Sequence, residues 1–306
     1  MSGPPTSLAD RRLGLLIGSL FGLPIGVLSG FTGVGGGEYR APVLLILFGR
    51  VRWAIATNLL VGAIVATFNV VFRRGWTLPL EDLVLGLLLI PGSLLGAYLG
   101  AIVTRRISSK ALKALLAGIL VATGLRLVLF EVPAGGTVSF DPLTVFLALV
   151  LGFGLGLISG LLGVAAGEYR IPALVLFFGV PTVLAGTLSS LVSIPGQLMG
   201  HIKHRSLGHT GKSSIRLGAA MGITSIVGVA LGVLVLGRAT ESAVTQVLGL
   251  AMVIAAARIV WEIWHPHPAE VQGIPGRAST KIEPLRERRG QSHRPSDGAG
   301  LGPDRN

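Results

Sequence analysis

Long uncharged apolar runs separate the charged residues along this chain. Five of these apolar runs contain no Asp, Glu, Lys or Arg: 13–31, 53–72, 83–104, 143–164 and 217–236. Their length matches the roughly 20 residues that a helix needs to cross a bilayer core of about 30 Å. Further runs of similar length are 111–130, 182–202 and 243–261, of which the first and the last contain charged residues. The pattern predicts an all-α, polytopic membrane protein with about eight transmembrane helices.

The composition agrees with a membrane protein. The chain has 306 residues, of which 51% are hydrophobic and 13% charged, whereas soluble domains carry about 25% charged residues. Its net charge of +12 lies mainly at the ends of the apolar runs and in the C-terminal region. That placement is typical of cytoplasmic loops and argues against a nucleic-acid-binding surface. The chain has no cysteine, which excludes disulfides, thiolate metal sites and a cysteine nucleophile.

The chain contains an internal duplication. Aligning 28–49 with 158–179, an offset of 130, gives identity at 12 of 22 positions, including the tetrapeptide GEYR in both copies. Weaker similarity continues at an offset of 132, where Arg126 aligns with Arg258. We therefore predict two repeats of four transmembrane helices each, as is common in secondary transporters. The predicted divisions are a leader (1–12), repeat 1 (13–130), a linker (131–142), repeat 2 (143–264) and a disordered basic tail (265–306).

The relative orientation of the repeats follows from the number of spans between the two GEYR copies. Four predicted spans separate them, and an even number predicts parallel repeats. The loops at 73–76 and 203–213 would then both be cytoplasmic. The basic segment TRRISSKALK (104–113) disagrees, because this topology turns it outward, against the positive-inside rule.

Each GEYR copy lies between a small-residue turn and a short apolar segment, 41–49 or 171–180. These segments are too short to span a bilayer, so we expect a Gly-rich broken or re-entrant helix in each repeat. Irregular backbone at membrane depth is tolerated only inside protein or beside a wet cavity. Pro42 and Pro172 suit the first turn of a short helix. The free N–H groups at such a helix start favour an anion.

The motif supplies the side chains of a candidate anion site. The guanidinium forks of Arg40 and Arg170 suit an oxyanion. Glu38 and Glu168 either hold these arginines or carry a coupled proton, and Tyr39 and Tyr169 offer hydroxyl groups. The predicted substrate-binding set also includes small and polar neighbours: Gly35, Gly36, Gly37, Thr57, Asn58, Gly167, Thr187, Ser190 and Gln197.

Structural interpretations compete with this site. GEYR could be a solvated loop at the membrane interface, and the polar residues at 57, 58, 187, 189, 190, 193 and 197 could serve only in helix packing. GEYR is identical in both copies although neighbouring residues differ, and this favours a functional role for the motif.

The chain resembles the TauE/SafE family of sulfite and organosulfonate exporters. The resemblance rests on GVGGGEYRAPVLL (33–45), AIATNLLVGA (54–63), GVAAGEYRIPALV (163–175) and LAGTLSSLVS (184–193). It implies a multi-pass anion permease of the plasma membrane, which would be a bacterial or archaeal inner membrane. GEYR is more charged than the usual turn of that family, and Ala165 and Ala166 stand where glycines are common.

These observations lead to a functional expectation. We expect a secondary transporter, most simply an exporter, of small oxyanions such as sulfite, organosulfonates or related organic acids. Its partners would be the anion, the lipid bilayer and a coupling proton or cation, with no nucleic acid, cofactor or metal. The alternatives are an anion channel or a non-transporting membrane protein. A membrane-embedded enzyme is a weaker alternative, because HExxH and GxSxG motifs and paired aspartates are missing.

Overall fold

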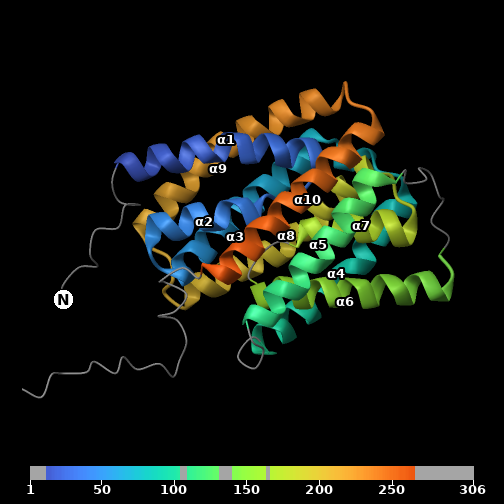
Figure 1. Cartoon of the computed structure of the whole chain (residues 1–306), viewed down its shortest axis with the longest axis horizontal. Helices are drawn as coiled ribbons and strands as arrows, with labels where there is room; N and C mark the ends of the chain where they lie inside the picture. The colour runs from blue at the N-terminus through green and yellow to red at the C-terminus, as the bar shows by residue number, and fades with distance from the viewer. Residues whose placement is uncertain (1–11, 104–108, 131–139, 163–165, 266–306) are drawn as a thin grey trace, which may run out of the picture.

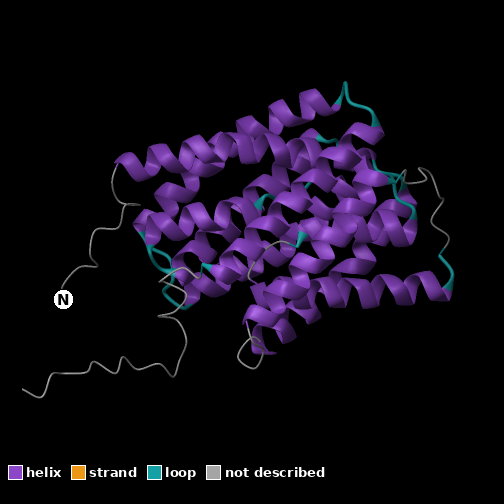
Figure 2. Ribbon diagram, in the orientation of Figure 1, coloured by secondary structure: helices purple, strands orange, loops and turns teal. Residues whose placement is uncertain are grey.

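The computed structural model describes residues 12–103, 109–130, 140–162 and 166–265. In this part of the chain the regular elements are all helices (Figure 2). In order they are α1 (Arg12–Thr32), α2 (Gly37–Phe48), α3 (Val51–Phe72), the 3-10 turn η2 (Gly75–Thr77), α4 (Leu80–Val103), α5 (Ser109–Leu129), α6 (Pro142–Leu162), α7 (Gly167–Phe178), α8 (Thr182–Ser206), α9 (Lys212–Leu236) and α10 (Glu241–Trp264). The predicted leader, linker and tail lie almost entirely outside the described residues.

Most of these helices can cross a membrane. Seven are long and apolar enough, namely α1, α3, α4, α6, α8, α9 and α10, and α5 contains the shorter apolar stretch Ala114–Leu129. The helices α2 and α7 have 12 residues each, so they extend about 18 Å and cannot span a core of about 30 Å. The predicted fold class, an all-α polytopic membrane protein, is confirmed.

Both short helices begin earlier than the sequence indicated. Each starts at the glycine of GEYR, so the motif forms the first helical turn. Pro42 and Pro172 therefore lie in the second turn, and their predicted place in the first turn is wrong. Pro42 lacks the N–H that would bond to the carbonyl of Glu38 four residues earlier. Arg258 of α10 donates a hydrogen bond to that carbonyl, which supplies the missing donor.

The helices α1 and α9 run parallel and pack closely through glycines. Successive glycines of α1 face successive residues of α9: Gly22 lies on Met221, Gly26 on Ser225 and Gly30 on Val229. A Cβ at Gly26 would lie 2.4 Å from the carbonyl oxygen of Ser225, so these backbones are in contact. The helices α4 and α6 pack in the same manner through Gly92, Gly96, Gly152 and Gly156. The first helix of each half is thus fixed to the other half through small residues.

The helices α3 and α8, which each follow a short helix, run antiparallel. The carbonyl oxygen of Ala56, near the start of α3, lies 2.9 Å from Nδ1 of His201 near the end of α8. At the opposite end, Arg73 donates a hydrogen bond of 3.0 Å to Thr187 near the start of α8. Parallel repeats would place these corresponding helices in the same direction. The prediction of parallel repeats is therefore wrong, and the two halves have inverted topology.

The short helices cause this inversion. The helix α3 runs parallel to α9, since Leu60 contacts Gly218 and Ile64 contacts Gly222. Because α1 also runs parallel to α9, α2 must carry the chain back between α1 and α3. Each half then has five consecutive segments of alternating direction, α1–α5 and α6–α10. An odd number of segments makes the second half start in the opposite direction from the first.

The two ends of the bundle differ in charge. The end where α1 starts and α10 finishes (left in Figure 1) carries seven of the described basic residues: Arg12, Arg50, Arg52, Lys203, Arg205, Lys212 and Arg216. The opposite end carries most of the acidic ones: Glu81, Asp82, Asp141 and Glu241. The positive-inside rule assigns the first end to the cytoplasm.

This assignment changes the expected sidedness of two loops. The loop after α3 lies at the end opposite to the loop after α8, so 73–76 and 203–213 do not share a side as predicted. Because the helices alternate in direction, α4 ends, and α5 begins, on the same side as the start of α1. The start of α5, which forms the second half of the basic segment 104–113, therefore no longer conflicts with the positive-inside rule; residues 104–108 lie outside the described part.

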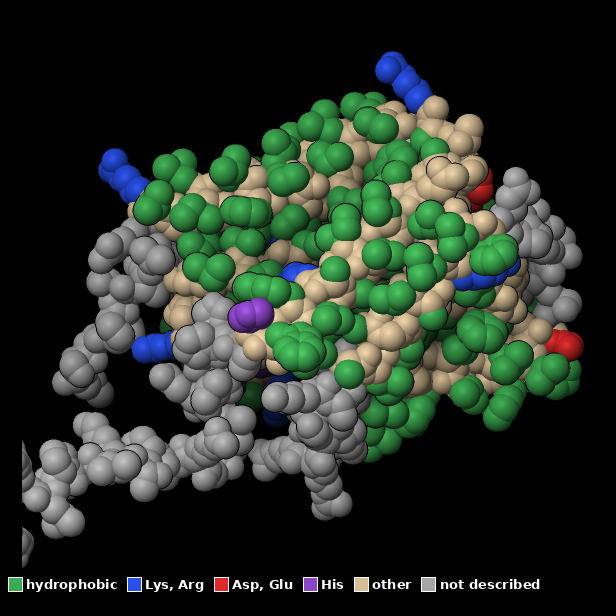
Figure 3. Space-filling view, viewed as in Figure 1, with side chains coloured by type: hydrophobic (Ala, Val, Ile, Leu, Met, Phe, Trp, Pro, Cys, Tyr) green, Lys and Arg blue, Asp and Glu red, His purple; other side chains and the backbone are tan. Residues whose placement is uncertain are grey.

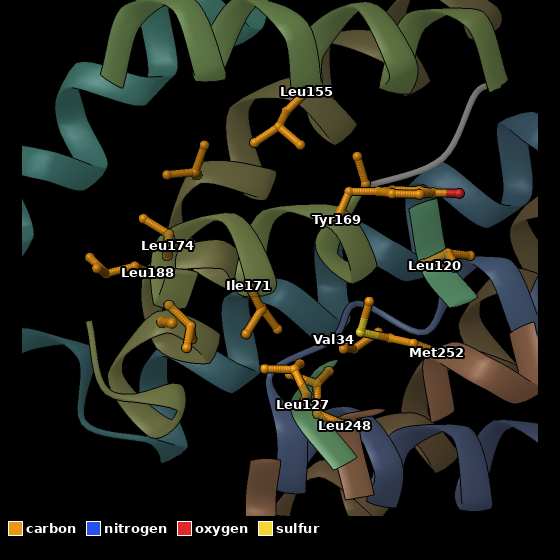
Figure 4. Packing of buried hydrophobic residues seen from close by; sticks show 14 of the residues in the cluster. Val34, Leu120, Leu127, Leu155, Tyr169, Ile171, Leu174, Leu188, Leu248 and Met252 are labelled. Carbon is orange, nitrogen blue, oxygen red and sulfur yellow. The ribbon is translucent and has the colours of Figure 1, made fainter. Parts of the chain in front are cut away.

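Apolar side chains fill the interior and also cover the outside. A buried cluster gathers residues from both halves around α7, including Val34, Leu127, Ile171 and Leu188 (Figure 4). Hydrophobic side chains also spread across the visible face of the bundle (Figure 3), as expected where lipid replaces water as the solvent. Apolar packing therefore does not explain the charged residues that are buried in the interior.

Candidate functional site

The two helix breaks meet at the interface between the halves. Gly36 and Ala166, the residues that precede α2 and α7, both have left-handed backbones, with φ of 67° and 52°. A Cβ at Gly167 would lie 3.2 Å from the backbone nitrogen of Gly35. The start of α7 therefore lies against the residues just before α2. Two positive helix ends thus lie close together, which favours an anion between them.

Arg40 is fully buried and only partly hydrogen-bonded. Its Nε donates to Oδ1 of Asn58 at 3.2 Å, and Nδ2 of Asn58 donates to the carbonyl of Gly37 at 3.1 Å. Asn58 thus orients the arginine from α3. Both terminal nitrogens of Arg40, Nη1 and Nη2, are buried without a hydrogen-bond partner.

Arg170 occupies the corresponding position in α7 but has different contacts. It is 2% exposed, and its Nη1 donates to the carbonyl of Ser189 at 2.9 Å and to Oγ of Ser193 at 2.7 Å. Both partners belong to α8, so this arginine ties α7 to α8.

Glu38 and Glu168 are both buried and interact electrostatically with each other. Oε1 of each carboxylate has no hydrogen-bond partner, and Glu168 interacts electrostatically with Arg40, Arg170 and Arg258. Arg258 forms an ion pair with Glu262. The motif carboxylates of both halves therefore share one buried electrostatic cluster with the arginines.

The two motif tyrosines lie in different surroundings. The hydroxyl of Tyr39 donates to the carbonyl of Ala251 in α10 at 2.6 Å. The hydroxyl of Tyr169 is buried without a partner, and Figure 4 shows its ring among the apolar residues near Leu120. Tyr169 therefore has the free hydroxyl of the pair.

The other polar candidates fall into two groups. Thr57 and Thr187 donate to carbonyls of their own helices, 2.9 and 3.1 Å away, and lie towards opposite ends of the bundle. Ser190 donates to the carbonyl of Gly33 at 3.1 Å and so fixes the first break. Gln197, by contrast, has a buried and unpartnered Nε2, so it joins Arg40 and Asn58 near the centre.

Unpartnered buried polar atoms concentrate at this centre. Among the described residues, nine such side-chain atoms occur, and five belong to Glu38, Arg40, Glu168 and Tyr169. Two more are Oγ of Ser189 and Nε2 of Gln197 on α8. Each buried polar atom without a hydrogen-bond partner lowers the stability by about 1–3 kcal/mol. Their concentration in one place calls for a shared partner, such as a polar ligand or ordered water.

A family model described as sulfite exporter TauE/SafE matches residues 3–127 and 148–296. The chain belongs to the TauE/SafE family. The resemblance seen in the sequence is confirmed, and with the seven apolar helices it makes this TauE/SafE protein a multi-pass membrane protein of a transporter family, not an enzyme. A comparison with curated proteins gave no match.

Three contributors to this region of the TauE/SafE protein were not among the predicted site residues. Ser189 and Ser193 stand in the same polar stretch of α8 as Ser190 and Gln197, and only the helix direction shows which of them face α7. Arg258 had a signal, because it aligns with Arg126 inside an apolar run. In the described residues no group of three or more His, Asp or Glu side chains could hold a metal ion.

Proposed function

We propose that this TauE/SafE protein is a secondary transporter that exports small oxyanions, such as sulfite, organosulfonates or related organic acids. The anion would bind where the two GEYR motifs meet, and the membrane would be a prokaryotic plasma membrane. The observation that carries this proposal is the group of buried donors without partners, above all Nη1 and Nη2 of Arg40.

The chemistry of these donors favours an anion over a cation or a neutral solute. A guanidinium fork binds two oxygens of one oxyanion. Discontinuous helices in transporters direct their N-termini towards anionic groups near the membrane midplane. Here α2 and α7 supply two such helix starts beside Arg40.

The inverted halves suit alternating access. In transporters with inverted repeats, the site lies between the repeats, and one bundle rocks against the other around it. The contact between Gly35 and Gly167 lies on this interface. Small movements of α2 and α7 would therefore change the access to the anion from either side.

Glu38 and Glu168 are our candidates for the coupled proton. A bound anion adds negative charge to a buried cluster that already contains both carboxylates. Protonation of one carboxylate would keep the total charge of the cluster unchanged, which matters where charges are shielded from water.

Uptake of labelled sulfite by liposomes that contain the purified protein tests the proposal. We expect saturable flux, reduced about tenfold or more by Arg40→Gln, since a hydrogen bond to a charged group contributes about 1.5–3 kcal/mol. Arg170→Gln should also reduce it, because it removes the hydrogen bonds that hold α7 on α8. Arg216→Gln, which removes an exposed positive charge at the cytoplasmic end, is the matched control and should keep normal flux.

Three results would contradict the proposal. Normal flux in both motif variants would make GEYR structural. Flux that rises linearly with sulfite concentration would favour an anion channel, and flux of a control cation would exclude anion selectivity.

A further inference from the structure

The two halves of the site are not equivalent. Arg40 keeps two unpartnered terminal nitrogens, whereas Arg170 uses Nη1 for two hydrogen bonds to α8. The two arginines occupy the same position of the same motif, so the difference must come from the residues around them.

The fork of Arg40 lies between two glycines. Nη1 is 3.3 Å from the point where a Cβ of Gly36 would lie, and Nη2 is 3.3 Å from the corresponding point at Gly62 of α3. Asn58 holds the opposite edge of the guanidinium through Nε. The fork is thus fixed in orientation, and its two terminal nitrogens are left for a ligand.

Gln197 reaches the same place from the other half. Its Oε1 lies 1.7 Å, and its Cδ 2.9 Å, from the point where a Cβ of Gly62 would lie. Any side chain at position 62 would therefore have to displace the end of Gln197. The remaining nitrogen, Nε2, is buried and unpartnered, so it provides a third donor beside the fork of Arg40.

The second half lacks this arrangement. At the offset of 130, the counterparts of Asn58, Gly62 and Gln197 are Leu188, Val192 and Thr67. Leu188 and Val192 are buried apolar residues. The hydroxyl of Thr67 donates to the carbonyl of Ala63 in its own helix at 2.8 Å. No equivalent set of donors surrounds Arg170 among these residues.

We propose that the protein binds one oxyanion at a time in an asymmetric site, in which Arg40 contributes two donors and Gln197 a third. Arg170 is a positioning residue that holds α7 on α8 and does not contact the anion. Gln197 then determines specificity, because three donors suit a head group with three oxygens, such as a sulfonate, better than a carboxylate with two. This inference rests on the proposed function, since it assigns roles within the same site.

Titration calorimetry on the purified protein in detergent tests the inference without any need for transport. Methanesulfonate and acetate are matched probes, because each joins one methyl group to a singly charged head group. We expect one methanesulfonate per chain. Gln197→Ala should lower the affinity for methanesulfonate about tenfold, as expected for the loss of one hydrogen bond to a charged ligand. It should lower the affinity for acetate less than about threefold. Gly62→Ala should have the same effect as Gln197→Ala, and Thr67→Ala is the control from the other half.

The two arginines give the second comparison. Arg40→Lys should lower the affinity for methanesulfonate about tenfold more than Arg170→Lys does, because a lysine cannot reproduce the bidentate fork. Arg170→Lys should instead lower the melting temperature more, because it loses the planar hydrogen bonds to Ser189 and Ser193.

Several outcomes would overturn the asymmetric site: two anions per chain, equal weakening by both lysine variants, equal effects of Gln197→Ala on the two probes, or no binding. Failure of the proposed function looks different. In that case the wild-type protein binds methanesulfonate but shows no saturable anion flux in liposomes.

Discussion

At the scale of single residues, the left-handed backbone conformation costs more free energy at the second helix break, where the residue is alanine, than at the first, where it is glycine. Ala166 has φ 52° and ψ 25°, a conformation that costs a residue with a Cβ about 1–2 kcal/mol, whereas Gly36 occupies the first break. We predict that Ala166→Gly raises the free energy of unfolding by up to about 1.6 kcal/mol, after the extra freedom of glycine in the unfolded chain, about 0.4–1 kcal/mol, is subtracted. Thermal unfolding in detergent measures this, with Gly36→Ala as the opposite change. A lower stability of Ala166→Gly would show that the methyl group is needed for packing.

The sequence indicated polar residues that the structure brings near one another, but not their separate roles. It indicated Arg40, Arg170, Asn58 and Gln197, because polar groups inside apolar runs need a partner. It could not separate Arg40 from Arg170, since the motif around both is identical. Their difference depends on a contact between Gly62 and Gln197, which requires knowledge of how α3 and α8 cross.

At the scale of helices, close packing between α1 and α9 depends on glycines, which have no side chain to separate the two backbones. A Cβ at Gly26 would lie 2.4 Å from the carbonyl oxygen of Ser225, and such an atom cannot move as a side chain can. We predict that Gly26→Ala lowers the free energy of unfolding by about 1–3 kcal/mol, as for overpacking elsewhere. Gly154 of α6 has nothing within 4 Å of its Cβ position, so Gly154→Ala is the matched control. Equal melting temperatures for the two variants would contradict this contact.

The lengths of the helices were predictable, but the start of the short ones was not. Apolar runs predicted the spans because a bilayer core fixes the length of a helix. Proline at 42 suggested a helix start, since it lacks an N–H. In the structure the helix begins a turn earlier, because Arg258 from α10 supplies the donor that the carbonyl of Glu38 would otherwise miss. A donor from so distant a position in the chain leaves no local signal.

At the scale of the whole molecule, the direction of the second half was the main error of the sequence analysis. Counting only full spans between the two motifs gave an even number and hence parallel repeats. The short helix α2 does not span, yet it reverses the chain between α1 and α3, and α7 does the same between α6 and α8. Those reversals make each half an odd set of five segments. The count failed because a re-entrant segment changes direction without adding a span.

The inverted topology makes a prediction that parallel repeats do not share. The chain has no cysteine, so single cysteines can be labelled with a membrane-impermeant maleimide. Thr77, after α3, and Ser206, at the end of α8, are both exposed and lie at opposite ends of the bundle. We expect Thr77→Cys to react in right-side-out vesicles and Ser206→Cys only in inside-out vesicles, because the basic end faces the cytoplasm.

Labelling of both positions from one side would restore the parallel arrangement and remove the antiparallel crossing of α3 and α8. The asymmetric site would fail with it, since the contact between Gln197 and Gly62 belongs to this antiparallel crossing of α3 and α8. Labelling from opposite sides but in the reverse sense would keep the inverted fold and the site intact. It would show instead that the basic end faces outward, against the charge distribution of the loops.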